Sequence, residues 1–244
     1  MSDTILDIRN ATKRFGGLTA VNEVSFSVRR GELLGIAGPN GSGKSTLFNI
    51  LTRIPFGPTS GEVWFDGQRI DRMAAHRIAA MGLSRTFQKD VEFPDLTAFE
   101  TVGVAATYGK GLSRRDLRDA AEAALDLVEF DPGRRAMPTT DLSVYQRKQL
   151  MIASALVMDP RVLMLDEPAS GLTRPEISAL EALLLKINAT GITVILIEHV
   201  LSLLMAVSER LVVLNQGALL AEGPPSDVMK NPAVIEAYLG TRAA

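Results

Sequence analysis

The chain has 244 residues, a formal net charge of −2 and no cysteine. This length suits one large α/β domain with a sizeable core and room for a small subdomain. The near-neutral charge gives no reason to expect a nucleic-acid partner, and the absence of cysteine excludes disulfide bonds, thiolate metal sites and a cysteine nucleophile.

The amino-terminal segment alternates apolar and polar positions over about 30 residues, which predicts strands of an antiparallel, half-buried sheet. Its apolar positions are Ile5, Leu6, Ile8, Val21, Val24, Phe26 and Val28. Phe15 also falls on these early strands. Its ring could stack on an adenine base or could fill the core.

Residues 38–46 (Gly-Pro-Asn-Gly-Ser-Gly-Lys-Ser-Thr) fit the phosphate-binding P-loop pattern G-x-x-x-x-G-K-[ST]. The apolar run Leu33–Ala37 predicts a buried strand before the loop, and the spacing of apolar residues in Thr46–Leu51 predicts a helix after it. A strand, a glycine-rich turn and a helix N-terminus together direct several backbone N–H groups into one small volume that suits phosphate oxygens. Lys44 adds a positive charge there, and the Ser45 hydroxyl can ligate Mg²⁺.

We therefore predict that this loop binds a nucleoside triphosphate; the alternative is a flexible glycine loop that matches the pattern by chance. The predicted binding residues are Gly38, Asn40, Gly41, Ser42, Gly43, Lys44, Ser45 and Thr46.

Weaker signals follow the loop. Gly61–Gly67 predicts another short strand that closes in a turn, and His76 falls in a polar helical stretch that places it on the surface. Gln88 stands at the junction with a helix-rich segment, where it could contact Mg²⁺ or its water. For an isolated glutamine, a surface role is the alternative.

The composition of the sequence changes over residues 89–150, and this segment predicts an α-helical subdomain. Asp116–Phe130 predicts a long helix that ends at Asp131-Pro132-Gly133. We expect residues 1–88 and 151–244 to form the nucleotide-binding core around this insert.

Two strongly apolar strands, Val162–Leu165 and Ile192–Ile197, follow the insert. Their continuous apolar character is typical of a parallel sheet that is buried on both faces. An amphipathic helix over Pro175–Ile187 lies between them and completes a βαβ unit. The tail from Gly223 to Gly240 predicts a turn and then short helical pieces.

Candidate catalytic residues follow these strands. Asp166 ends the first strand at the sheet edge where ligands collect, and can hold Mg²⁺. Glu167 is placed to polarise a water for in-line attack on a γ-phosphate; the alternative is a pair of acids that cap the next helix. His199 follows the second strand and can reach the γ-phosphate and stabilise its charge.

No membrane signal is expected in this sequence. Residues 1–4 lack the basic and apolar regions of a secretory signal. The most apolar stretch, Ile192–Val207, is too short to span a bilayer and contains Glu198 and His199. We expect a soluble protein that could dock on a membrane protein.

The order of these motifs resembles the ATP-binding-cassette (ABC) ATPase family over essentially the whole chain. The motifs are the P-loop, Gln88, Leu142–Gln146, Asp166-Glu167 and His199. Within the family the chain most resembles the ATP-binding subunits of branched-chain amino acid importers, through Arg14–Leu18, Thr86–Gln88, Phe93–Thr97 and Asn231–Gly240. The resemblance implies an α/β P-loop NTPase core with a mostly parallel sheet, an N-terminal antiparallel β subdomain and an α-helical insert.

The resemblance also implies an activity and a set of partners. Catalysis of ATP hydrolysis would fall to Glu167, His199 and Gln88, and Mg²⁺ would be held by Ser45, Gln88 and Asp166. Two ATPase subunits would sandwich ATP head to tail, with Ser143 and Gln146 of each signature segment facing the other subunit's P-loop. Closure on ATP would drive a pair of membrane permeases, supplied by a substrate-binding protein, from the cytoplasmic face of the membrane.

The chain departs from the family at two places. The signature usually reads Leu-Ser-Gly-Gly-Gln or Leu-Ser-Tyr-Gly-Gln, whereas Val144 and Tyr145 occupy its third and fourth positions here. Thr173 stands where the family usually has aspartate or asparagine. A glycine in the fourth position lets a backbone N–H approach the partner's γ-phosphate, and Tyr145 puts a bulky side chain there.

Both departures fall on surfaces that would face the partner. We hypothesise that the chain hydrolyses ATP at its own P-loop but supports the partner's site poorly, which favours a heterodimer over a homodimer. The alternative is a signature that still binds γ-phosphate with lower efficiency.

We therefore expect an ATPase subunit that powers uptake of branched-chain or related amino acids. One alternative is an exporter ATPase, because lipopolysaccharide-export ATPases have similar sequences. A soluble ABC ATPase that acts on nucleic acid is disfavoured by the single cassette and the lack of basic excess. A small-molecule kinase would not be expected to combine Leu142–Gln146 with Gln88 and His199. The sequence does not identify the transported solute, since no residue of this subunit needs to touch it.

Overall fold

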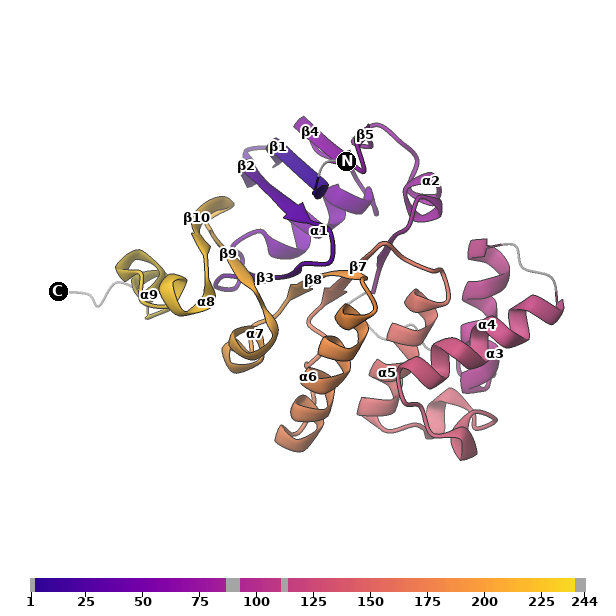
Figure 1. Ribbon diagram of the computed structural model, residues 1–244. Coiled ribbons are helices and arrows are strands. Elements are labelled where there is room, and N and C mark those ends of the chain that lie inside the picture. Colours follow the sequence, from indigo (N-terminus) through magenta and orange to yellow (C-terminus); the bar gives the residue numbers. More distant parts are fainter. Residues whose placement is uncertain (1–2, 87–92, 111–113, 240–244) are drawn as a thin grey trace. The chain divides into compact units, whose positions relative to one another are not determined.

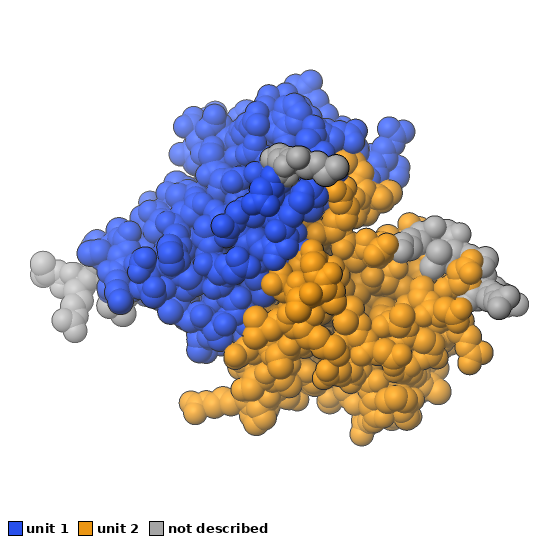
Figure 2. Space-filling view, viewed as in Figure 1, with its two compact units in different colours: residues 1–78, 193–244 blue, residues 79–192 orange. Residues whose placement is uncertain are grey.

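The computed structural model describes residues 3–86, 93–110 and 114–239. The chain forms two compact units, one of residues Met1–Ile78 with Thr193–Ala244 and one of residues Ala79–Ile192 (Figure 2). The division at 88/89 and 150/151 that composition indicates stays a prediction.

The first unit contains an antiparallel sheet whose strand order is β2-β1-β4-β5. Its strands are β1 (Thr4–Phe15), β2 (Leu18–Arg29), β4 (Ser60–Phe65) and β5 (Gln68–Arg69) (Figure 1). Ile8 pairs with Phe26 on one side and with Val63 on the other, and all three side chains are buried. The predicted alternation of the amino-terminal segment is therefore confirmed, because one face of these strands is covered.

The same unit contains four further strands in the order β10-β9-β3-β8. They are β3 (Leu33–Ala37), β8 (Thr193–Ile197), β9 (Arg210–Asn215) and β10 (Ala218–Gly223). β3 is parallel to both β8 and β9, and every residue of β3 and β8 is buried, as the apolar runs predict. The helices of this unit are α1 (Lys44–Thr52), α7 (Leu201–Val207), α8 (Pro225–Val228) and α9 (Pro232–Leu239).

The second unit holds the parallel pair β6 (Leu83–Arg85) and β7 (Val162–Asp166) and a group of helices. These are α3 (Ala98–Ala105), a π-helical stretch (Ala106–Lys110), α4 (Arg114–Leu127), α5 (Val144–Leu156) and α6 (Arg174–Ala189). Short 3₁₀ turns occur at Pro132–Arg134 and Thr139–Asp141, and α2 (Ala75–Ala80) lies where the two units join along the chain. His76 on α2 is exposed, as predicted.

Helices α3, α4 and α5 contact one another and bury Val102, Leu125 and Ile152 (Figure 1). α4 ends at Leu127 rather than at the predicted Phe130, because Glu129 adopts a left-handed backbone with φ of 57°. The N–H of Phe130 then donates to the carbonyl of Leu125, and the N–H of Glu129 donates to that of Asp126, which closes the helix. None of the helices within the described ranges combines the length and the apolar character that a bilayer-spanning segment requires.

Candidate functional site

The P-loop joins the end of β3 to the start of α1, in the first unit. Its glycines are required by backbone conformation and by space: φ is 147° at Gly38, 79° at Gly41 and 102° at Gly43. A Cβ at Gly38 would lie 2.2 Å from the carbonyl oxygen of Leu214, and one at Gly43 would lie 2.5 Å from that of Ala20. A side chain at either glycine would therefore collide with neighbouring backbone, so the path of the loop requires glycine at both positions.

The polar groups of this loop suit an anion. Gly43 is the N-cap of α1 and has no capping side chain, and the first N–H groups of an α-helix have no partner within the helix. Lys44 is buried, and its Nζ donates to the carbonyl oxygens of Gly38 at 2.7 Å and Pro39 at 3.2 Å. The Oγ of Ser42 is buried and has no hydrogen-bond partner among the residues that the structure describes.

Other P-loop residues are accessible to a ligand. Asn40, Gly41 and Ser45 are exposed, and Thr46 is half-buried. A buried ammonium group, helix N–H groups and accessible hydroxyls together match the donors that phosphate oxygens require.

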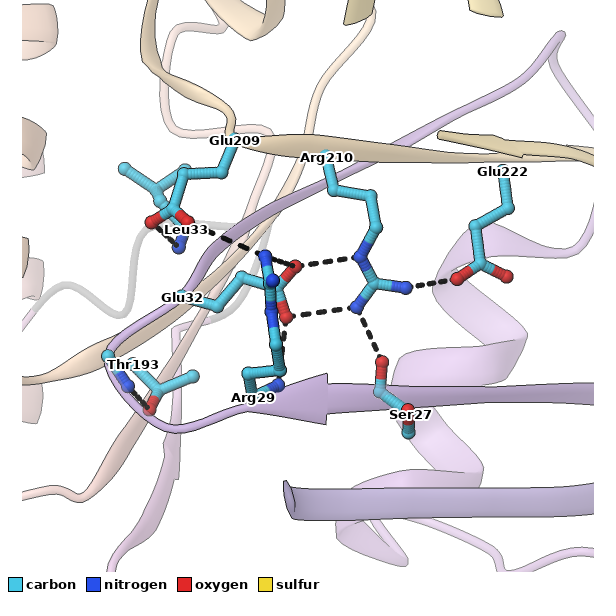
Figure 3. A network of polar contacts seen from close by, with 9 residues as sticks. Ser27, Arg29, Glu32, Leu33, Thr193, Glu209, Arg210 and Glu222 are labelled. Carbon is cyan, nitrogen blue, oxygen red and sulfur yellow. Dashed lines mark hydrogen bonds and ion pairs between the residues drawn. The ribbon is translucent and has the colours of Figure 1, made fainter. Parts of the chain in front are cut away.

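A polar network fixes the chain where it enters β3 (Figure 3). The Arg210 guanidinium on β9 forms two hydrogen bonds with the Glu32 carboxylate, from Nε at 2.7 Å and from Nη2 at 2.9 Å. Arg210 also donates to the carbonyl of Ser27 on β2 at 2.6 Å and pairs with Glu222 on β10. The backbone N–H of Arg29 adds a bond to Glu32 at 2.8 Å.

The Glu32 side chain is only 1% exposed. Burial by itself raises the pKa of Glu32, but hydrogen bonds from Arg210 and from the Arg29 backbone outweigh it and leave the pKa lowered. The carboxylate therefore stays charged and links β2 and β9 to the start of β3, the strand that leads into the P-loop.

Phe15 is 43% exposed at the end of β1, so the alternative that it is a core residue is wrong. Its ring meets Phe56 edge to face with centroids 5.0 Å apart. Lys13 Nζ lies 5.2 Å from the Phe15 centroid and 4.4 Å from that of Phe56. Phe56 packs against the Phe15 ring. It was not predicted, although an aromatic residue between Pro55 and Gly57 is a visible signal.

In the second unit, Asp166 ends β7 and is 2% exposed. Arg85 Nη2 donates to Asp166 Oδ2 at 2.8 Å, and the Arg85 side chain is 5% exposed. Burial lowers the pKa of Arg85, and the pairing with Asp166 opposes that shift without cancelling it. Arg85 comes three residues before Gln88 and was not among the predicted site residues.

Glu167 has a left-handed backbone with φ of 51°, a conformation that is strained for a residue with a side chain. It is half-buried and directly follows the apolar strand β7. The catalytic role of Glu167 stays a prediction.

His199 follows β8 with its side chain 53% exposed. The neighbouring Glu198 is fully buried, and its Oε2 accepts the backbone N–H groups of His199 at 3.2 Å and Val200 at 3.4 Å. Glu198 thus shapes the turn that presents the imidazole, a role that was not predicted from the sequence.

The signature segment begins α5. Ser143 is its N-cap: the Ser143 Oγ accepts the Gln146 N–H at 3.2 Å, and Gln146 Oε1 accepts the Ser143 N–H at 3.0 Å. This capping box stabilises the helix start and leaves the serine hydroxyl proton able to donate.

The two departures from the family pattern share a neighbour in this unit. Thr173 donates from its N–H and its Oγ1 to Glu176 Oε2, at 2.8 and 2.7 Å. Tyr145 is half-buried; burial raises the pKa of its phenol, and the charges of Glu129 and Glu176 raise it further. The Glu176 carboxylate is therefore bonded to Thr173 and close enough to Tyr145 to raise the pKa of its phenol.

Gln88 lies outside the described residues. Of the other predicted site residues, the structure assigns the P-loop, Phe15 and His199 to the first unit, and assigns Ser143, Gln146, Asp166 and Glu167 to the second.

Comparison with known proteins gives two family matches. A family model described as ABC transporter matches residues 21–170, and one described as branched-chain amino acid ATP-binding cassette transporter matches residues 218–244. The chain is 42% identical to the high-affinity branched-chain amino acid transport ATP-binding protein BraF of Pseudomonas aeruginosa, over 98% of this chain and 99% of that protein.

Solved structures are similar over nearly the whole chain. An ATP-binding cassette of an ABC transporter in its ADP conformation is 28% identical with a TM-score of 0.88, and the match covers 98% of this chain and 100% of that one. A dimeric cassette in a post-hydrolysis state, bound to ADP and Pi, is 27% identical with a TM-score of 0.81, and the match covers 91% and 99% of the two chains.

Proposed function

Because the chain belongs to the ABC transporter family and is one of its ATP-binding, ATP-hydrolysing subunits, we propose that it powers the uptake of branched-chain amino acids. The match of residues 218–244 to the branched-chain amino acid cassette model carries this assignment of substrate. The name of the relative BraF supports it.

The P-loop holds the triphosphate in this proposal. Lys44 and the N–H groups at the start of α1 bind the β- and γ-phosphate oxygens, and the glycines let the backbone approach them. The exposed ring of Phe15, supported by Phe56, stacks on the adenine.

Magnesium fits the oxygen donors that the chain supplies. Ser45, Asp166 and Gln88 are the proposed ligands, directly or through water. When bound, Mg²⁺ neutralises charge on the phosphate oxygens. Glu167 orients and polarises the attacking water, and His199 donates a hydrogen bond to the γ-phosphate.

The family works as an ATPase component of membrane transporters, and a similar cassette is a dimer. We propose that this chain pairs with a second, different ATPase subunit at the cytoplasmic face of the membrane. There the pair couples ATP binding and hydrolysis to two permease subunits, which take solute from a substrate-binding protein.

Asymmetry of the pair follows from the altered region around Tyr145. A phenol at the fourth signature position keeps the backbone of α5 from the partner's γ-phosphate, and its neighbour Glu176 adds negative charge. The site completed by this signature would therefore turn over slowly, whereas Glu167 at this chain's own P-loop would catalyse at the ordinary rate.

Glu167→Gln in this chain, compared with the equivalent change in the partner, tests the asymmetry. We expect the change in this chain to remove most of the ATPase activity of the complex and the change in the partner to remove little. Equal losses would refute the asymmetric assignment.

Uptake by the purified transporter tests the transport function. The complex is reconstituted in liposomes with ATP inside, and radiolabelled leucine is offered outside with the binding protein. We expect ATP-dependent accumulation that Lys44→Ala in this chain abolishes. ATP-dependent uptake of another solute in place of leucine, isoleucine or valine would contradict the proposed substrate while leaving the ATPase assignment in place.

A further inference from the structure

One backbone group of the P-loop is held by the far end of the chain. The N–H of Gly38, the first residue of the loop, donates to the Tyr238 hydroxyl oxygen at 2.7 Å. This distance is short for a neutral N–H···O hydrogen bond, and 200 positions of sequence separate the two residues.

The position of Tyr238 is set by the last helix of the first unit. α9 contacts β10, and Val234 on this helix is fully buried while Ile235 is 42% exposed. Asn231 caps the helix start, because its side chain accepts the Ala233 N–H at 3.0 Å. The helix thus lies with one side against the unit, and Tyr238 projects from it to the loop.

The phenol is held in its neutral form. Burial raises the pKa of Tyr238, although the bond from the Gly38 N–H acts in the opposite direction. A neutral hydroxyl accepts the Gly38 N–H and still has a proton to donate.

Other carboxyl-terminal groups back the same loop. The carbonyl of Leu214 occupies the space that a Cβ at Gly38 would need. The N–H of Gly217 donates to the carbonyl of Ser42 at 3.0 Å. The carboxyl-terminal part of the chain therefore contacts the loop at its start, through Leu214 and Tyr238, and at its middle, through Gly217. Of these three residues, Tyr238 makes its contact with a side chain.

We propose that Tyr238 is a positioning residue for ATP binding: its hydroxyl fixes the start of the P-loop, and this hydrogen bond raises the affinity of the subunit for nucleotide. The proposal rests on the P-loop as the ATP site, as in the proposed function, and on nothing about the transported solute. The hydroxyl never touches the nucleotide. It holds Gly38 so that the following N–H groups already point into the phosphate site before phosphate arrives, which reduces the ordering cost of binding.

Tyr238→Phe removes the hydroxyl and keeps the ring, so it isolates this hydrogen bond. We expect the Kd for ATP and for ADP to rise about 3- to 10-fold, as for loss of one buried hydrogen bond, with kcat at saturating ATP unchanged. Hydrogen–deuterium exchange of the peptide that spans β3 and the P-loop should become faster. Tyr108→Phe, at a tyrosine that is 86% exposed, is the matched control and should change neither value.

Two further variants keep the outcomes distinct. Ile235→Ser alters the exposed part of α9 and should leave nucleotide affinity unchanged, so a loss there would assign the effect to helix docking and overturn the role of the hydroxyl. Lys44→Ala should weaken ATP binding at least 10-fold; if it does not, the P-loop assignment fails. If it does while Tyr238→Phe binds like wild type with unchanged exchange, only the Tyr238 proposal is refuted.

Discussion

Replacing Glu32 by glutamine should destabilise the first unit by removing the charge at the centre of the network in Figure 3. Each carboxylate oxygen accepts two hydrogen bonds. Oε1 receives Arg210 Nε at 2.7 Å and Arg29 Nη2 at 3.3 Å, and Oε2 receives Arg210 Nη2 at 2.9 Å and the Arg29 N–H at 2.8 Å. A glutamine amide can replace only one of these oxygens as an acceptor, so its NH₂ group faces two donors whichever way it turns.

The magnitude follows from burial. Hydrogen bonds to charged groups contribute about 1.5–3 kcal/mol each, and removing one partner of a buried ion pair costs about 3–5 kcal/mol. Arg210 is 17% exposed and would keep its contacts with Ser27 and Glu222. We therefore expect Glu32→Gln to lower the free energy of unfolding by about 3 kcal/mol, at the lower end of that range. At about 2–4 °C per kcal/mol for a chain of this size, the melting temperature falls by roughly 6–12 °C.

Urea unfolding followed by circular dichroism, together with thermal melts, measures this loss. Glu222→Gln is the matched control: it removes a carboxylate that is 34% exposed from the same guanidinium and should cost at most about 1 kcal/mol. A second test replaces both buried partners, as Glu32→Leu with Arg210→Met, which should recover stability relative to Glu32→Gln because no charge is left unpaired. Equal stabilities of Glu32→Gln and Glu222→Gln would refute the reasoning.

Acid unfolding and nucleotide binding offer three further tests. The pKa of Glu32 is lowered in the folded state, so its ionised carboxylate stabilises the fold fully above about pH 4.3. This stabilisation is lost as pH falls through the folded pKa. The free energies of unfolding of wild type and Glu32→Gln should therefore converge in acid. Lys44→Ala should weaken ATP binding at least 10-fold in a calorimetric titration, since charge-assisted bonds to phosphate are lost; affinity within twofold would contradict the P-loop assignment. Phe15→Ala should weaken ATP and ADP equally, by about 1–3 kcal/mol of stacking, while inorganic triphosphate competes as before; a loss for triphosphate as well would show a folding defect.

Local patterns explain most of what could be predicted. The apolar runs at β3, β7 and β8 are buried throughout, because a parallel strand with both faces covered needs no polar positions. The P-loop pattern likewise specifies a strand, a turn and a helix that are adjacent in sequence, so its geometry is a local property.

The hairpin of β9 and β10 was not predicted, although its signals are present. Leu211–Leu214 is an apolar run, and Gln216-Gly217 forms a two-residue turn with positive φ at both positions. Glycine is the usual second residue of such a turn, whereas glutamine is uncommon at the first, so the sequence cue is incomplete. Pairing of β9 with the distant β3 fixes the hairpin in place.

The residues that support the site escaped prediction for a different reason. Arg85 is hydrogen-bonded to Asp166, which is 81 positions away in the sequence, and Tyr238 is hydrogen-bonded to Gly38, which is 200 positions away. Arg85 and Tyr238 lie outside the sequence motifs that contain Asp166 and Gly38. Without a motif, an arginine is most often interpreted as a surface residue, and a tyrosine as a surface or core residue. A binding motif identifies the residues that contact the ligand, because those residues are close in sequence. The residues that hold the motif in its binding conformation do so through tertiary contacts. Residues that change affinity without contacting the ligand can therefore be identified only in the folded structure.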